Sequence, residues 1–352
     1  MLHGRSLLVR QFVARKVVFG IVLLLLACNL AGIAAGQSPA PAPEAKADSN
    51  RKPLSSFRED WTTPGLSTSQ MHVSEILGPM LDTAHEGYTV ELLRLTWRPG
   101  DPVDVYVLRP VGSRKPPVIL NLYGYPTDTD PYKLEGIQKE FVKGGFAAVG
   151  FVSALTGQRY HDKPLKEWFL SELQQSLATS AHDVQILIDY LTKRGDLDAS
   201  RIGMFGNGSG GTIAILASVA DPRIKVLDVF DPWADWPTWL ATSTFVPADE
   251  RADYVKPEFL KKVACLETLD WLPKIQAKKF RLQQPAFDTD TPNAVKEKVR
   301  ATAPAGTVFV QYKSMEEFKA AFPYSSNLEW MKRELVALPD SGATEEASTP
   351  KH

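Results

Sequence analysis

Ser209 stands in a cluster of small residues and could act as a nucleophile. It belongs to the stretch Gly206-Asn-Gly-Ser-Gly-Gly211, whose remaining residues are all glycine apart from Asn207. A serine hydroxyl attacks a carbonyl carbon only when a neighbouring base, usually an imidazole, takes its proton. His161, in Arg159-Tyr-His-Asp162, is one candidate for that base, although a loop histidine is most often simply solvated. These residue types indicate acyl transfer if the fold brings them together.

The residues on either side of the serine predict a strand, a sharp turn and a helix. The apolar run Ile202–Phe205 is typical of a strand, and Thr212–Ala220, rich in Ala, Ile and Leu without a breaker, is typical of a helix. Such a turn lifts one side chain above the sheet edge and directs the N–H groups of the helix start to the same point. Glycine is needed where the turn is strained and where the strand and helix backbones come close together.

The stretch Arg201–Gly211 resembles the nucleophile elbow of α/β-hydrolases, especially of the dienelactone-hydrolase and prolyl-oligopeptidase-like branches. An alignment on Arg201-Ile-Gly203 and the later glycines places Gly208 at the nucleophile position and Ser209 one residue after it. An alignment on the serine puts Asn207 in place of the first glycine and adds one residue before it. The first alignment keeps more landmarks. We therefore expect a degenerate elbow without a nucleophile, formed by Gly206, Gly208, Ser209 and Gly210.

The resemblance also implies the places of an oxyanion hole and of a catalytic acid. Tyr125, in Tyr123-Gly-Tyr-Pro126, would supply one oxyanion-hole N–H group and Ser209 the other. The alternative is a plain glycine turn after a buried strand. Asp288 would be the triad acid after the seventh strand, whereas an Asx-turn or a helix cap suits Asp290 better.

The histidine that this family carries after its last strand has no counterpart here. It would lie near Lys313–Glu316, but the chain has no histidine between His182 and His352. His182 begins a predicted helix, so we expect it to be a surface or capping residue. Because a serine without an imidazole lacks its base, the triad is expected to be incomplete.

Three tryptophans follow the sixth predicted strand, where this fold inserts a lid. Trp233, Trp236 and Trp239 recur every third residue and share one side of a helical turn. They either pack the lid against the core or form an aromatic wall over a pocket. The whole insertion, about 232–278, is helical in character, with helices predicted over Pro257–Leu266 and Leu269–Ala277.

The rest of the chain alternates strands and helices. This pattern predicts an α/β fold, with a mostly parallel sheet and helices on both faces, and the α/β-hydrolase resemblance implies about eight strands. The runs Tyr88–Trp97 and Val103–Leu108 predict an antiparallel pair at one edge, and the strand Ile202–Phe205 is expected at the centre. The α/β-hydrolase-like domain is predicted over residues 66–338.

The N-terminus has the layout of a targeting segment. A basic region precedes the apolar run Val17–Ala27, and Ala34-Ala-Gly36 fits a signal-peptidase site, so residues 1–36 predict a cleaved signal peptide. Two alternatives are a lipid-bearing Cys28 and retention of Val17–Ala35 as an anchor. Residues 37–65 form a Pro/Ala-rich linker and N-terminal extension, and 339–352 a disordered tail. Each alternative places the domain outside the cytoplasm, and only this N-terminal segment would contact a membrane.

Composition gives no reason to expect several kinds of partner, and the incomplete triad that the resemblance implies favours a binding role. The formal net charge of −1 gives no electrostatic reason to expect nucleic acid. The chain lacks His-x-x-x-His pairs, cysteine clusters and a dinucleotide fingerprint, so we expect no metal and no cofactor. We expect an exported protein with a degraded triad that binds a small carbonyl or carboxylate ligand, or another protein, without catalysis. The alternative is a serine esterase or peptidase-like hydrolase that uses Ser209 with an unorthodox base.

Overall fold

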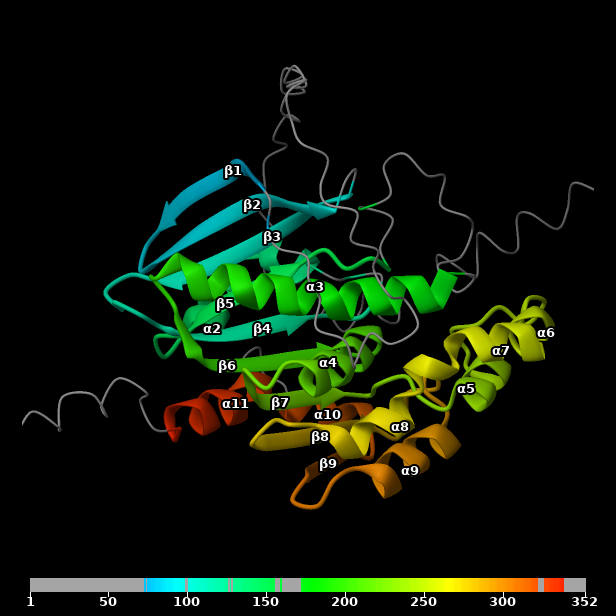
Figure 1. Ribbon diagram of the computed structural model, residues 1–352. Coiled ribbons are helices and arrows are strands. Elements are labelled where there is room, and N and C mark those ends of the chain that lie inside the picture. Colours follow the sequence, from blue (N-terminus) through cyan, green and yellow to red (C-terminus); the bar gives the residue numbers. More distant parts are fainter. Residues whose placement is uncertain are drawn as a thin grey trace, which may run out of the picture. The chain divides into compact units, whose positions relative to one another are not determined.

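The computed structural model describes residues 75–98, 101–125, 129–155, 172–321 and 326–338, together with Val73, Thr127 and Arg159 (Figure 1). All of them belong to one compact unit, Leu54–His352. The predicted signal peptide, linker and tail lie outside the described residues, as does His161.

Within the described residues, nine strands form one sheet in the order β1-β2-β3-β5-β4-β6-β7-β8-β9. Its antiparallel part comprises β1 (Glu75–His85), β2 (Tyr88–Arg98) and β3 (Asp101–Pro110), and β3 pairs antiparallel with β5. The remaining neighbours are parallel: β5 (Ala147–Phe151), β4 (Pro117–Leu122), β6 (Asp198–Asn207), β7 (Ile224–Phe230), β8 (Lys279–Pro285) and β9 (Val308–Tyr312). The prediction of a mostly parallel sheet is confirmed.

The strand that leads into the glycine turn is central, because β6 lies between β4 and β7. The pair within Tyr88–Leu108 is antiparallel as predicted, but it is not the sheet edge. The edge is β1, an additional strand that the sequence did not predict. Pro79 interrupts its alternation, and the register shifts between Ile76 and Pro79 and again between Pro79 and Leu81. A proline at a bulge interrupts the alternation of apolar and polar residues, which explains why β1 was not predicted as a strand.

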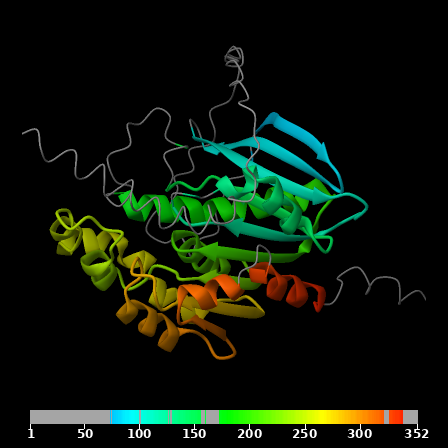
Figure 2. The same ribbon diagram turned by 180° about the vertical axis from the view of Figure 1, so that it is seen from behind.

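Helices cover both faces of the sheet (Figures 1 and 2). α3 (Leu173–Arg194) and α4 (Ser209–Ala220) share one core with the sheet, and α2 (Glu135–Val142) and α11 (Ser326–Val336) share the other. α4 is buried all round, from Ser209 to Val219, which explains why its sequence has no polar face. The packing around α4 therefore fixes the position of its first residue, Ser209.

The insertion between β7 and β8 is helical, as predicted. It contains α5 (Trp236–Thr242), α6 (Arg251–Tyr254), α7 (Pro257–Val263) and α8 (Thr268–Trp271), with 3₁₀ turns at Ala264–Leu266 and Leu272–Lys274. The two predicted helices are shorter than expected, in part because Pro273 cannot continue α8. The other helical elements described are η1 (Asp130–Lys133), α9 (Asn293–Thr302) and α10 (Met315–Ala321). No described helix is both long and apolar enough to cross a membrane.

Candidate functional site

Gly208 forms the turn between β6 and α4. Its backbone has φ 54° and ψ −118°, and its N–H donates to the Phe230 carbonyl at 2.9 Å. A residue with a side chain is strained at a positive φ, whereas glycine adopts it readily. The positive φ that the glycine alignment predicts for this residue is therefore present. Ser209, by contrast, is already the first residue of α4.

The glycines around Gly208 let three backbone segments meet. A Cβ atom on Gly206 would lie 2.3 Å from the Gly210 carbonyl oxygen, and one on Gly210 would lie 2.2 Å from the Leu122 carbonyl oxygen. A Cβ atom on Gly208 would meet only Trp233 Nε1, at 3.6 Å, which is an ordinary contact. The turn is thus too tight for side chains at Gly206 and Gly210, but it has room for one at Gly208.

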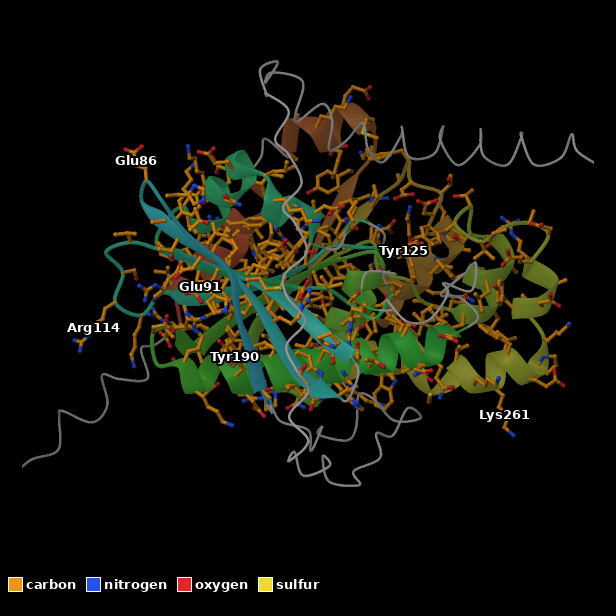
Figure 3. All side chains as sticks on the ribbon, turned by 90° about the horizontal axis from the view of Figure 1, so that it is seen from above. Glu86, Glu91, Arg114, Tyr125, Tyr190 and Lys261 are labelled. Carbon is orange, nitrogen blue, oxygen red and sulfur yellow. The ribbon has the colours of Figure 1, made fainter. Side chains whose placement is uncertain are left out.

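The Ser209 hydroxyl is turned toward the loop after β4. Ser209 is only 2% exposed, and its Oγ accepts a hydrogen bond from the Tyr125 N–H at 2.9 Å. Figure 3 shows Tyr125 at the end of the sheet nearer the lid helices, with Arg114 at the opposite end. Tyr125 and Ser209 were expected to offer their N–H groups to a ligand oxygen atom. In the structure, the Tyr125 N–H instead donates to the hydroxyl group of Ser209 itself.

Two carboxylates, one buried and one half-buried, lie after the ends of β7 and β8. Asp288 follows β8, and its Oδ1 accepts from the Asp290 N–H at 2.8 Å, an Asx-turn geometry. Burial raises the pKa of Asp288. Asp231 follows β7 directly, is buried, and has φ 47°. Asp231 was not among the site residues expected from the sequence. An acidic residue immediately after a buried strand was the signal that could have identified it.

Lys296 of α9 joins these two loops. Its Nζ donates to the carbonyl oxygens of Pro285 and Asp288, both at 2.6 Å, and lies 3.7 Å from Asp231 Oδ2. Burial raises the pKa of Asp231 well above its usual range, because the lysine offsets only part of the desolvation. The site therefore holds a carboxyl group that stays protonated well above the usual pH range for an aspartate.

This pKa predicts a stability that falls as the pH rises. Between the ordinary pKa of 3.8 and the raised folded pKa, the folded chain binds more protons at Asp231 than the unfolded chain. The free energy of unfolding of the wild-type protein, relative to that of Asp231→Asn, should therefore fall by about 1.4 kcal/mol for each pH unit in this range. Urea unfolding of both proteins from pH 4 to pH 7 measures it, with exposed Asp82→Asn as the control. If the difference in free energy of unfolding between the wild-type protein and Asp231→Asn did not change with pH, the raised pKa of Asp231 would be contradicted.

The histidines among the described residues are His85 and His182, and neither follows the last strand. His182 lies inside α3 and is buried, so the expectation of a surface or capping residue was wrong. After β9, α10 brings Phe318, whose ring packs on Phe230 at 5.5 Å and on Tyr312 at 5.4 Å. Where the family resemblance implies an imidazole, the described chain therefore places an aromatic cluster.

The three lid tryptophans are buried. Trp233 packs on Trp239 at 4.5 Å and on Phe245 at 5.2 Å, and Phe245 contacts the ring of Tyr125 at 5.8 Å. Trp236 packs edge-on against Trp239. The structure thus brings Trp233 to Gly208, while Trp236 and Trp239 fill the lid interior, as the packing alternative predicts.

A cavity of about 210 Å³ lies between β8, β9 and α9, and none of the three tryptophans lines it. Its lining residues are Gln284, Pro285, Ala286, Asn293, Lys296, Glu297, Arg300 and Gln311. Among the residues that the structure describes, no group of His, Cys, Asp and Glu side chains could hold a metal ion.

Solved structures show which fold this is. The chain is similar to an acetyl xylan esterase from Paenibacillus sp. R4 (15% identity over 77% of this chain and 90% of that chain, TM-score 0.55). It is also similar to an S-formylglutathione hydrolase from Agrobacterium tumefaciens (13% identity, 74% and 100%, TM-score 0.56) and to a 2,6-dihydroxy-pseudo-oxynicotine hydrolase (20% identity, 70% and 68%, TM-score 0.53). No family model and no curated protein matches the chain. The chain has the α/β-hydrolase fold.

Proposed function

We propose that this protein is an exported ligand-binding member of the α/β-hydrolase fold, without Ser-His-Asp hydrolysis. The observation that carries the proposal is Gly208 at the turn between β6 and α4, where its backbone has a positive φ and no side chain is present. The N-terminal basic and apolar regions of the sequence support export. The solved neighbours bear the names of esterases and hydrolases, but identities of 13–20% transfer the fold and not the reaction.

The chemistry at Ser209 supports the same conclusion. Its hydroxyl is buried and engaged by the Tyr125 N–H, and it belongs to the helix and not to the turn. Among the described residues no side chain is placed to take its proton, and a hydroxyl group that stays protonated is a weak nucleophile. Burial raises the pKa of Asp231 and of Asp288, so the charged form that a triad acid uses is less favoured at both residues than at an exposed aspartate.

The ligand that fits this site is a small carbonyl or carboxylate compound. A side chain at Gly208 would have room, because an added Cβ atom would meet only Trp233 Nε1, at 3.6 Å. A ligand oxygen atom in this room would lie at the start of α4, and the N–H groups of a helix start favour a carboxylate or carbonyl oxygen. The apolar part of such a ligand would contact Trp233 and Phe245, which pack beside the turn.

Esterase assays test the loss of catalysis. We expect wild-type protein to hydrolyse p-nitrophenyl acetate and butyrate no faster than its Ser209→Ala variant, because no residue that the structure describes offers the Ser209 hydroxyl a base. Gly208→Ser restores a hydroxyl at the turn but still lacks the imidazole, so its rate should remain within about tenfold of background. A wild-type rate far above background that Ser209→Ala abolishes would favour a serine esterase instead.

Binding assays test the ligand. Thermal shift and calorimetry with acetate, butyrate and benzoate should show binding to the wild-type protein. Gly208→Ser fills the room above the turn and should weaken that binding at least tenfold. The matched control is Gly136→Ser, at an exposed α2 residue whose Cβ would meet nothing within 4 Å. Equal affinity in the wild-type protein and Gly208→Ser would place the ligand elsewhere.

A further inference from the structure

The indole ring of Trp233 presents its N–H group to the turn. A Cβ atom added to Gly208 would lie 3.6 Å from Trp233 Nε1, and apart from its chain neighbours no other atom of the described residues comes within 4 Å of it. The two ring carbons bonded to Nε1 are therefore farther from the turn than Nε1 itself. Because the N–H bond points outward from this corner of the ring, it is directed into the room above the turn.

A ligand oxygen atom in this room can accept from the indole. A hydrogen bond between an N–H group and an oxygen atom spans about 2.9 Å, so the oxygen atom needs to lie only about 0.7 Å closer to Nε1 than the added Cβ atom. An indole N–H group donates and cannot accept. The ligand atom that faces it is therefore an acceptor, such as a carboxylate or carbonyl oxygen.

Two threonines hold the Trp233 backbone in place. Its carbonyl oxygen accepts from Thr212 Oγ1 at 2.8 Å and from Thr268 Oγ1 at 2.7 Å, and both threonines are buried. Thr212 belongs to α4, which begins at the turn, and Thr268 belongs to α8 of the lid. The Trp233 ring also packs on Phe245. The donor is thus fixed relative to the start of α4, and a donor that is ordered before binding lowers the entropic cost of binding.

The other two lid tryptophans place their N–H groups elsewhere. Trp236 and Trp239 are buried, and neither Nε1 atom has a hydrogen-bond partner among the described residues. Neither indole comes within 4 Å of the Cβ atom added to Gly208. These two side chains contribute apolar surface to the lid interior, whereas Trp233 also brings a donor to the turn.

We propose that Trp233 determines the ligand specificity of this site by donating its indole N–H to an oxygen atom of the ligand. A carboxylate fits best, because one of its oxygen atoms can face the indole while the other faces the N–H groups at the start of α4. This inference rests on the proposed ligand-binding function.

Calorimetry with benzoate tests the proposal. Trp233→Phe keeps an aromatic ring but removes the donor, so it should weaken binding about tenfold or more, as expected for a lost hydrogen bond to a charged acceptor. Trp236→Phe makes the same chemical change at a buried indole away from the turn, and this matched control should bind benzoate like the wild-type protein.

Three results would overturn the proposal. If Gly208→Ser loses binding but Trp233→Phe binds like the wild-type protein, this inference fails and the proposed function stands. An equal loss in Trp233→Phe and Trp236→Phe would attribute the effect to lid packing and not to the donor. Wild-type protein that binds none of the three carboxylates would overturn the proposed function and this inference together.

The indole N–H resonance of Trp233 gives a second test in the wild-type protein. Saturating benzoate should move this proton resonance downfield, because a hydrogen bond to a carboxylate deshields the proton. The indole resonances of Trp236 and Trp239 should shift much less. A Trp233 resonance that stays in place while benzoate binds would overturn the inference, even if Trp233→Phe failed to fold.

Discussion

Asp183→Asn is expected to lower the free energy of unfolding by about 3–5 kcal/mol, the usual cost of removing one partner from a buried ion pair. Asp183 is fully buried in α3 and binds two arginines, Arg98 at the end of β2 and Arg159. Its Oδ1 also accepts from Trp97 Nε1 at 2.9 Å. The substitution would remove the buried carboxylate that both guanidinium groups share and leave them the charge of Asp101, which is itself partly exposed.

Urea unfolding at neutral pH measures this cost, and Asp104→Asn is its control. Asp104 pairs with Arg94 at 2.7 Å, but about a third of each side chain is exposed, so this substitution should cost less than about 1 kcal/mol. Burial alone would raise the pKa of Asp183, yet Arg159 and Arg98 hold it below its usual range. The stabilisation is therefore present above the unfolded pKa and is lost as the pH falls through the folded pKa. Equal costs for the two substitutions would contradict the ion network.

Gly210→Ala should destabilise the protein by about 3 kcal/mol or more, because overpacking against a backbone cannot be relieved by a rotamer change. The new Cβ atom would lie 2.2 Å from the Leu122 carbonyl oxygen and 3.0 Å from that of Tyr123. Relieving this clash requires α4 to move away from β4, although α4 is buried all round. Thermal and urea unfolding measure the loss.

Substitutions at two other glycines distinguish the effect of a steric clash from the effect of backbone strain in the same assay. Gly208→Ala fits the available room, but its φ of 54° should cost about 1–3 kcal/mol. Gly136→Ala, in open space on α2, should be neutral or stabilising by up to about 1 kcal/mol. A Gly210→Ala variant as stable as Gly136→Ala would mean that the turn is not closely packed.

Local sequence patterns were sufficient for most of the sheet. The central strand was predicted from Ile202–Phe205, which lies in the buried part of β6, because a buried parallel strand is a continuous apolar run between turn signals. The position of Gly208 at the turn was predictable for a similar reason, since close backbone approach and positive φ both require glycine. β1 was missed because Pro79 breaks the alternation on which strand prediction depends.

Long-range contacts could not be predicted in the same way. Asp183 and Arg98 are separated by 85 residues, and no local pattern indicates that they form one network. The Ser209 hydroxyl binds the Tyr125 N–H across 84 residues, so its occupation of a predicted oxyanion-hole donor depends on the loop geometry. His182 was placed on the surface because its helix was predicted to begin near it. α3 in fact begins at Leu173, which puts His182 in the buried middle.

Lys296 joins the carboxyl ends of β7 and β8. Its ammonium group contacts Asp231, which follows β7, and the backbone of Pro285, the last residue of β8. The Asp231 N–H also donates to the Gln283 carbonyl at 2.9 Å. The lid leaves the sheet at this edge but, because β7 and β8 are parallel, it returns at Lys279, at the opposite edge. The first stem of the lid is thus anchored to β8 directly, and the lid beyond this stem could change in sequence or length while the ends of β7 and β8 stay joined.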